Sequence, residues 1–420
     1  MITTRRGAVA ALLALSMTLP LVQAATATAA APSDAPSAGK PVSGKAVSAA
    51  APSAAFPSAA PARKAPSVVL PRPTGPHAVG VSTLQLTDRT RTDPWLPQSG
   101  ARRLLVSVHH PARPDTGGRV ERYLRPAEAR ELVRQFGDGT LPPGSAELLA
   151  GTESWARQGA RPTKGRFPLV VLSPGFGTPR KSQTLLAEDL ASRGYVVASV
   201  DHAYESRATA FPGRGVLPCV ACEKADSGEI TLESVAEGRA RDISFVLDRL
   251  TGPRPVWKHS AMIDASRIGM AGHSIGGASA ASTMARDTRV DAGVNMDGSF
   301  FDPVPRKGLD GRPFLMLGAE DGAPGSGDAT WEKAWKRLDG WKRWLTVTGT
   351  QHDTFSDLPV LADRIPGWPT VPGSLPGDRA AQITRTYVAA FLDRHLKAAH
   401  RPVLNGPTRA NPEVLFHAPR

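Results

Sequence analysis

The feature that most constrains the fold of this chain is the pentapeptide at 272–276, GHSIG, which has the pattern G-x-S-x-G. The apolar run 267–271 precedes it, and the small residues 277–284 follow it. A buried strand, a tight turn and a helix in this order form a nucleophile elbow, where glycines let the strand and the helix approach each other closely. The sequence therefore predicts that Ser274 stands on such a turn at the carboxyl end of a strand.

Strand patterns alternate with helix patterns through most of the chain. Alternating residues at 79–86 and 103–109 predict an antiparallel pair, and 126–150 is predicted to be helical. Continuous apolar runs, typical of buried parallel strands, lie at 167–173, 195–201, 267–271, 292–296, 313–318 and 344–348. Further helices are predicted at 182–193, 232–250 and 379–397. This order predicts an α/β fold with a mostly parallel, doubly wound sheet and antiparallel N-terminal strands.

The first part of the chain has the composition of an export signal and a spacer. Residues 1–24 combine Arg5 and Arg6, an apolar stretch and a small-residue cleavage site, which predicts a signal peptide of the general or the twin-arginine type. Residues 25–70 are rich in Ala, Pro and Ser and are expected to be disordered. We therefore expect a secreted, extracellular protein with its folded domain at 71–400 and a C-terminal tail at 401–420.

The charge of the chain argues against nucleic-acid binding. The formal net charge is +13, and beyond position 70 the chain carries 45 basic against 37 acidic residues. The arginines are scattered and form no dense basic stripe with interleaved aromatic residues, so no nucleic-acid partner is expected. A transient contact with an anionic lipid surface stays open, and no transmembrane segment is expected because the apolar stretch of the signal is short.

The chain has two cysteines, Cys219 and Cys222, in a C-x-x-C arrangement. In an exported protein this spacing predicts a local disulfide. Two thiolates without a nearby histidine pair do not complete a zinc site, so no metal is expected. The surrounding segment, 203–230, is a candidate lid.

A serine nucleophile needs a base and an acid, both at carboxyl ends of strands. His352 begins the loop after the strand 344–348 and is the predicted base, whereas His202 precedes the serine in the chain and His273 lies inside the elbow. Asp297 and Asp321 follow consecutive strands, and Asp297 is favoured with Asp321 as the alternative.

A serine nucleophile of this kind also needs two amides that bind the developing oxyanion. Ile275, directly after the serine, supplies one, and Phe176 in the glycine-rich loop 173–177 is predicted to supply the other. No metal or organic cofactor is needed for this chemistry.

Together these residues resemble the secreted platelet-activating factor acetylhydrolases and their bacterial relatives in the α/β-hydrolase superfamily. The resemblance rests on the loop 173–177, the segment 272–277, Asp297 and His352, and it extends to the segments 75–80, 189–197 and 201–202. It implies an α/β-hydrolase fold and a calcium-independent esterase acting on short or oxidised sn-2 acyl chains of phospholipids. It also favours Asp297 as the acid and suggests Phe300 and Phe301 as walls of an acyl pocket. Pro174 stands where the family usually has a histidine.

The sequence thus predicts a secreted serine carboxylic ester hydrolase with the triad Ser274, Asp297 and His352, acting on a small ester or a phospholipid. One alternative keeps the chemistry and changes the substrate to that of a general short-chain esterase, lipase or polyester hydrolase. A remote alternative is a hydrolase-fold binding protein without activity.

Overall fold

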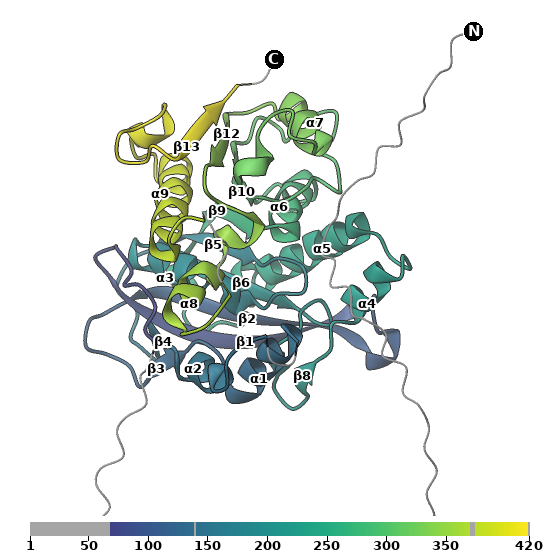
Figure 1. Ribbon diagram of the computed structural model, residues 1–420, viewed down its shortest axis with the longest axis vertical. Helices are drawn as coiled ribbons and strands as arrows, with labels where there is room; N and C mark the ends of the chain where they lie inside the picture. The colour runs from purple at the N-terminus through teal and green to yellow at the C-terminus, as the bar shows by residue number, and fades with distance from the viewer. Residues whose placement is uncertain (1–67, 138–139, 370–373, 419–420) are drawn as a thin grey trace, which may run out of the picture. The chain divides into compact units, whose positions relative to one another are not determined.

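The computed structural model describes residues 68–137, 140–369 and 374–418 (Figure 1). The predicted signal peptide and nearly all of the predicted leader lie outside the described residues.

An 11-stranded mixed sheet forms the centre of the described part, in the order β13-β12-β11-β10-β9-β5-β6-β2-β1-β4-β3. The strands are β1 (Ala78–Thr92), β2 (Ala101–Ala112), β3 (Val120–Arg122), β4 (Glu153–Gln158), β5 (Phe167–Ser173), β6 (Val196–His202), β9 (Ile263–His273), β10 (Ala292–Met296), β11 (Phe314–Gly318), β12 (Lys342–Val347) and β13 (Val414–His417).

The six strands from β6 through β5, β9, β10 and β11 to β12 pair with one another in parallel. Most of their residues are buried, because helices cover both faces, and this explains their continuous apolar sequences. The antiparallel pair β1–β2 joins this parallel block through β6. The predicted α/β fold with antiparallel N-terminal strands is therefore confirmed.

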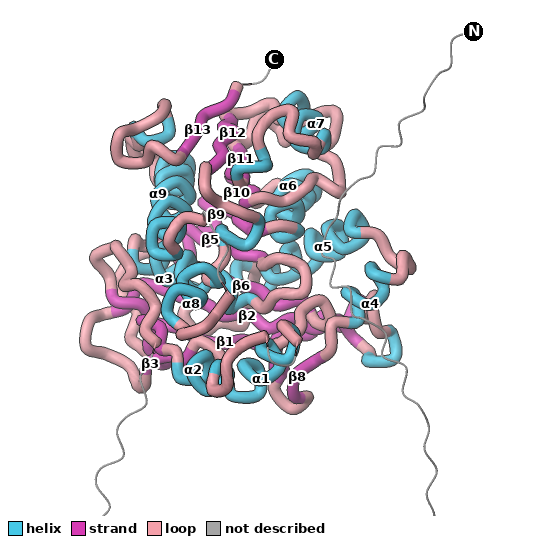
Figure 2. The backbone as a smooth tube through the Cα atoms, viewed as in Figure 1, coloured by secondary structure: helices cyan, strands magenta, loops and turns pink. Residues whose placement is uncertain are grey.

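Two groups of helices enclose the sheet. The helices are α1 (Pro126–Gln135), α2 (Ser145–Gly151), α3 (Thr184–Ser192), α4 (Val220–Asp226), α5 (Leu232–Thr251), α6 (Ile275–Arg286), α7 (Ala329–Arg337), α8 (Leu358–Arg364) and α9 (Gly377–Leu396). Apolar residues of α3 and α9 share one buried cluster with the strands, and those of α5, α6 and α7 share another. The strands accordingly run between α3 and α9 on one side and α5 and α6 on the other (Figure 2).

The region 126–150, predicted to be helical throughout, forms two helices with a break between them. Pro142 and Pro143 lie in the break, and Gly144, the residue just before α2, has a φ of 87°. Proline lacks the amide needed to continue a helix, and glycine tolerates the left-handed conformation, so the chain turns here.

The C-terminal residues form part of the sheet and not a tail. Val414–His417 is strand β13, which pairs antiparallel with β12, with Val347 opposite Val414 and Trp344 opposite His417. The edge of β12 carries unpaired backbone groups that a further strand satisfies, and this explains why a segment assigned to a tail is ordered.

The segment between β6 and α5 is the candidate lid. It contains the strands β7 (Thr209–Phe211) and β8 (Gly215–Leu217) and the helix α4, and it carries the disulfide between Cys219 and Cys222 predicted from the sequence. Its apolar residues pack with Trp95, Phe176 and Ile275 in one cluster. Among the described helices, none has the length and apolar character needed to span a bilayer.

Candidate active site

Ser274 occupies the turn between β9 and α6, as the pentapeptide predicts. Its φ of 55° and ψ of −128° are a conformation that residues with side chains rarely adopt. A Cβ at Gly272 would lie 2.2 Å from the carbonyl carbon of Gly276, and one at Gly276 would lie 2.0 Å from the carbonyl oxygen of Ser173. The two glycines are therefore required, and the elbow rests directly on the loop that follows β5.

His352 connects Ser274 to Asp297. Its Nε2 lies 2.9 Å from the Ser274 Oγ, and its Nδ1 lies 2.7 Å from the Asp297 Oδ2. Since the Asp297 carboxylate can only accept, Nδ1 donates to it and Nε2 is left to accept the serine proton. The other Asp297 oxygen accepts from the amide of Ala319 at 2.7 Å, which holds the carboxylate in place.

The two candidate acids lie at consecutive strand ends, and of these two only Asp297 forms a hydrogen bond with His352. Asp297 follows β10 with a φ of 57°. The buried side chain of Asn295 bonds to both the amide and the carbonyl of Gly298, and so braces this turn. Asp321 is exposed, and it affects His352 through charge alone.

The pKa of His352 is raised above its usual value. Its partial burial acts in the opposite direction and disfavours the charged imidazolium. The hydrogen bond and the negative charge of Asp297 outweigh this effect, with smaller contributions from Asp353 and Asp321. The arrangement thus stabilises an imidazolium at this position, which is the charge state that follows proton transfer from serine.

The loop 173–177 ends in a turn that fixes the direction of the Phe176 amide. The carbonyl of Gly175 accepts from the Thr178 amide at 3.3 Å and from its hydroxyl at 3.0 Å, and Gly177 has a φ of 76°, as a type II turn requires. In a trans peptide the N–H points opposite to the preceding carbonyl, so fixing the Gly175 carbonyl also fixes the direction of the Phe176 amide.

Ile275 is the first residue of α6, and amides in the first turn of a helix have no intrahelical acceptor. Its amide therefore stays available next to the Ser274 hydroxyl. The positive end of the helix dipole adds to the attraction for an anion there.

His273 was not predicted to have a role, yet it bonds to the loop that carries His352. Its Nε2 donates to the main-chain carbonyl of His352 at 2.7 Å, and the two ring centroids lie 4.8 Å apart. Burial and the neighbouring charge of His352 lower its pKa, so it stays neutral and donates one proton. Its position next to the serine was visible in the sequence, but nothing there indicated a partner 79 positions later.

The two phenylalanines suggested as pocket walls lie in different environments. Phe300 is 2% exposed, and its ring packs in the core near the rings of Phe314 and Trp331. Phe301 is half-buried and belongs to the cluster that contains Phe176 and Ile275. Phe300 is thus a core residue, whereas Phe301 borders the site.

The chain is similar to several known esterases. The sequence model of the family described as platelet-activating factor acetylhydrolase, isoform II, matches residues 150–237 and 256–403. A probable 1-alkyl-2-acetylglycerophosphocholine esterase from Arthroderma benhamiae is 28% identical over 377 residues, which cover 82% of this chain and 92% of the relative. The platelet-activating factor acetylhydrolase of Bos taurus is 25% identical over 264 residues, 56% of this chain and 58% of the relative.

A solved structure is similar in both fold and sequence. The ferulic acid esterase from Streptomyces cinnamoneus superposes with a TM-score of 0.73 at 43% identity, over 84% of this chain and 100% of that chain. Esterases in both comparisons argue against the non-catalytic alternative. The chain belongs to the platelet-activating factor acetylhydrolase isoform II family and is a carboxylic ester hydrolase.

Proposed function

We propose that this protein is a secreted serine esterase in which Ser274 is the nucleophile, His352 the general base and Asp297 the group that orients the base. The observation that carries the proposal is the continuous path from the Ser274 Oγ through His352 to Asp297, at 2.9 and 2.7 Å. Secretion is proposed from the signal-peptide pattern at 1–24 alone.

The reaction proceeds in two stages. Ser274 attacks the ester carbonyl while its proton moves to Nε2 of His352, and the resulting oxyanion accepts hydrogen bonds from the amides of Phe176 and Ile275. His352 then gives this proton to the leaving alcohol as the acyl-enzyme forms. Water, deprotonated by the same imidazole, releases the acid. Each oxyanion amide contributes about 3 kcal/mol to the lowering of the barrier.

The proposed substrates are esters of short or oxidised acyl chains, with 1-alkyl-2-acetylglycerophosphocholine as the reference compound. Support comes from the family match and from the relative with that printed activity, which aligns over 92% of its own length. Phe301 and Phe176 border the site, and such side chains form an apolar wall for an acyl group.

A second candidate is the hydrolysis of ferulic acid esters. The observation that favours it is the 43% identity to the ferulic acid esterase over the full length of that chain. General short-chain, lipase and polyester activities are further alternatives within the same chemistry.

The chemistry is tested with Ser274→Ala and a fluorophosphonate probe on the purified protein. We expect labelling at Ser274 in the wild type, none in the variant, and a loss of activity of about 10³-fold or more. Turnover of the variant near the wild-type rate would reject Ser274 as nucleophile.

The substrate is tested by comparing kcat/KM on acetylated ether phospholipid, methyl ferulate, p-nitrophenyl acetate, a long-chain ester and a polyester film. The highest kcat/KM on the acetylated phospholipid supports the first candidate. The highest value on methyl ferulate supports the second.

A further inference from the structure

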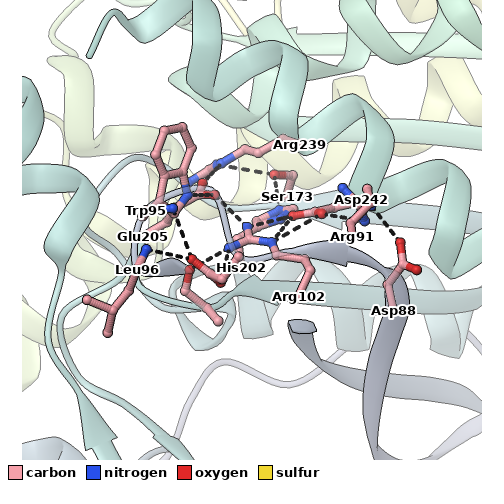
Figure 3. A network of polar contacts seen from close by, with 12 residues as sticks. Asp88, Arg91, Trp95, Leu96, Arg102, Ser173, His202, Glu205, Arg239 and Asp242 are labelled. Carbon is pink, nitrogen blue, oxygen red and sulfur yellow. Dashed lines mark hydrogen bonds and ion pairs between the residues drawn. The ribbon is translucent and has the colours of Figure 1, made fainter. Parts of the chain in front are cut away.

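A second serine, histidine and aspartate, Ser173, His202 and Asp242, lie together in the interior (Figure 3). Ser173 ends β5, His202 ends β6 and Asp242 lies on α5. The Ser173 Oγ lies 3.2 Å from His202 Nε2, and His202 Nδ1 lies 2.8 Å from Asp242 Oδ2. None of the three is more than 2% exposed, so this serine has no access to a substrate and the set is not a second active site.

The same cluster offers three groups of the kind that bind metals, His202, Glu205 and Asp242, within 4.8 Å of one another. The guanidinium of Arg102 already pairs with both of these carboxylates. Arg102 donates to Glu205 at 2.6 Å and to Asp242 at 2.7 Å. A second cation would face that positive charge at close range in a buried site, so the cluster is an ion-pair network and not a metal site.

The donor and the acceptor of each hydrogen bond among Ser173, His202 and Asp242 follow from the chemistry of the side chains. Asp242 can only accept, so Nδ1 of His202 donates to it and Nε2 accepts from the Ser173 hydroxyl. The Ser173 oxygen is then left to accept from Nη1 of Arg239 at 3.2 Å. Burial and the charge of Arg239 lower the pKa of His202, which keeps the imidazole neutral and this pattern intact.

Arg239 also bonds to the main chain of the loop. Its Nη1 donates to the carbonyl of Pro174, and its Nε donates to Glu205 Oε2 at 2.7 Å. The main-chain carbonyl of Glu205 in turn accepts from the amide of Gly177 at 3.0 Å. Arg239 thus holds the start of the loop directly and is tied to the residue that holds its end, with Phe176 between the two points.

We propose that Arg239 is a positioning residue for the oxyanion hole, which holds the Phe176 amide in register with Ser274 by fixing Pro174 and Ser173. The inference rests on the proposed function, since it assigns a support to the amide named there. Arg239 itself does not touch the substrate. An amide that is held in place before the reaction stabilises the transition state more than the bound ester, so its loss affects kcat more than KM.

The test compares Arg239→Gln and Arg239→Lys with the wild type. We expect kcat to fall by about 10- to 100-fold in Arg239→Gln, because loss of one oxyanion donor costs about 10²- to 10³-fold and here the donor is displaced but present. KM should stay within about twofold. Arg239→Lys keeps the charge and one donor, and it should recover part of kcat.

A trifluoromethyl ketone inhibitor separates this role from a purely structural one. Its adduct with the serine places an oxyanion in the hole, so its Ki should rise by the same factor as kcat/KM falls. Arg312→Gln is the matched control, because Arg312 also donates to main-chain carbonyls, at Met284, Val290 and Leu309. It should lower stability without changing kcat or Ki.

Ser173→Ala provides a second, smaller variant if Arg239→Gln does not fold. It removes the hydroxyl that joins His202 to Arg239 and should lower kcat several-fold with a matching rise in Ki. Unchanged kcat, or a lower kcat with unchanged Ki, would overturn the inference. With either of these two outcomes, Ser274 of the wild type would still react with fluorophosphonate. A wild type that fails to react would instead refute the proposed function itself.

Discussion

At the scale of single residues, Asp297 raises the pKa of His352, and this has a measurable consequence. Only the neutral imidazole accepts a proton, so activity rises with pH through the pKa of His352, which lies above its usual value of about 6.5. Asp297→Asn removes the charge that raises this pKa. The inflection in the pH profile of kcat/KM should therefore move to lower pH, while kcat falls by about 10³-fold or more because the orienting group is lost.

Asp321→Asn is the control for this prediction, because Asp321 raises the same pKa without a hydrogen bond to His352. It should move the inflection slightly in the same direction and leave kcat near the wild-type value. A larger loss of kcat in Asp321→Asn than in Asp297→Asn would assign the acid to Asp321.

His273 offers a second prediction at this scale, since its Nε2 donates to the carbonyl of His352. His273→Phe keeps a ring of similar shape but has no donor, so the base loop should lose its tether and kcat should fall by about tenfold. His273→Gln can place an amide nitrogen near the same point and should retain most of kcat. Equal activities of the two variants in a kcat assay would show that the hydrogen bond is not what matters.

At the scale of elements, the elbow and the loop 173–177 are in contact through Gly276. A Cβ there would lie 2.0 Å from the carbonyl oxygen of Ser173 and 2.8 Å from that of Pro174. Gly276→Ala should therefore push the loop away, lower kcat, and reduce the free energy of unfolding by about 1–3 kcal/mol. Urea denaturation and a kcat assay measure the two effects.

Gly406→Ala is the matched control for this substitution. Among the described residues, no heavy atom lies within 4 Å of a Cβ built at Gly406. Its free energy of unfolding should change by less than about 0.5 kcal/mol, as at most surface positions. A similar loss in both variants would contradict the contact argument.

The sequence was sufficient to predict the strands of the parallel block, the pair β1–β2 and the strand ends that carry Ser274 and His352. Both follow from local patterns, since apolar runs mark strands and a motif marks the turn. It could not predict β13, because the strand is short and is held by the edge of β12. Nor could it predict the partner of His273, or that Phe300 faces the core, because these depend on contacts between segments far apart in the chain.

At the scale of the whole molecule, the buried ion pairs predict how stability depends on pH. Burial alone would raise the pKa values of Glu205 and Asp242. The charges of Arg239 and Arg102 lower the pKa of Glu205, and the charge of Arg102 together with the hydrogen bond from His202 lowers the pKa of Asp242. Groups with lowered pKa values bind fewer protons in the folded state than in the unfolded state. The stability they contribute is therefore present above about pH 4, the usual carboxyl range, and is lost as the pH falls further.

Glu205→Gln tests this dependence. At pH 7 it should lower the free energy of unfolding by about 3–5 kcal/mol, because it removes the carboxylate that pairs with the buried guanidinium of Arg239 and one of the three that pair with Arg102. The difference from the wild type should shrink at pH 3, which denaturant titrations at several pH values can measure. Asp378→Asn, at an exposed pair with Arg364, should cost less than about 1 kcal/mol at either pH.

The bond from His273 to the carbonyl of His352 joins the turn that carries Ser274 to the loop that carries His352, and the turn itself packs against Ser173. Segments that are joined by such contacts are expected to unfold together. On heating, catalysis and tertiary order should therefore vanish at one temperature, with no interval in which a folded but inactive enzyme accumulates.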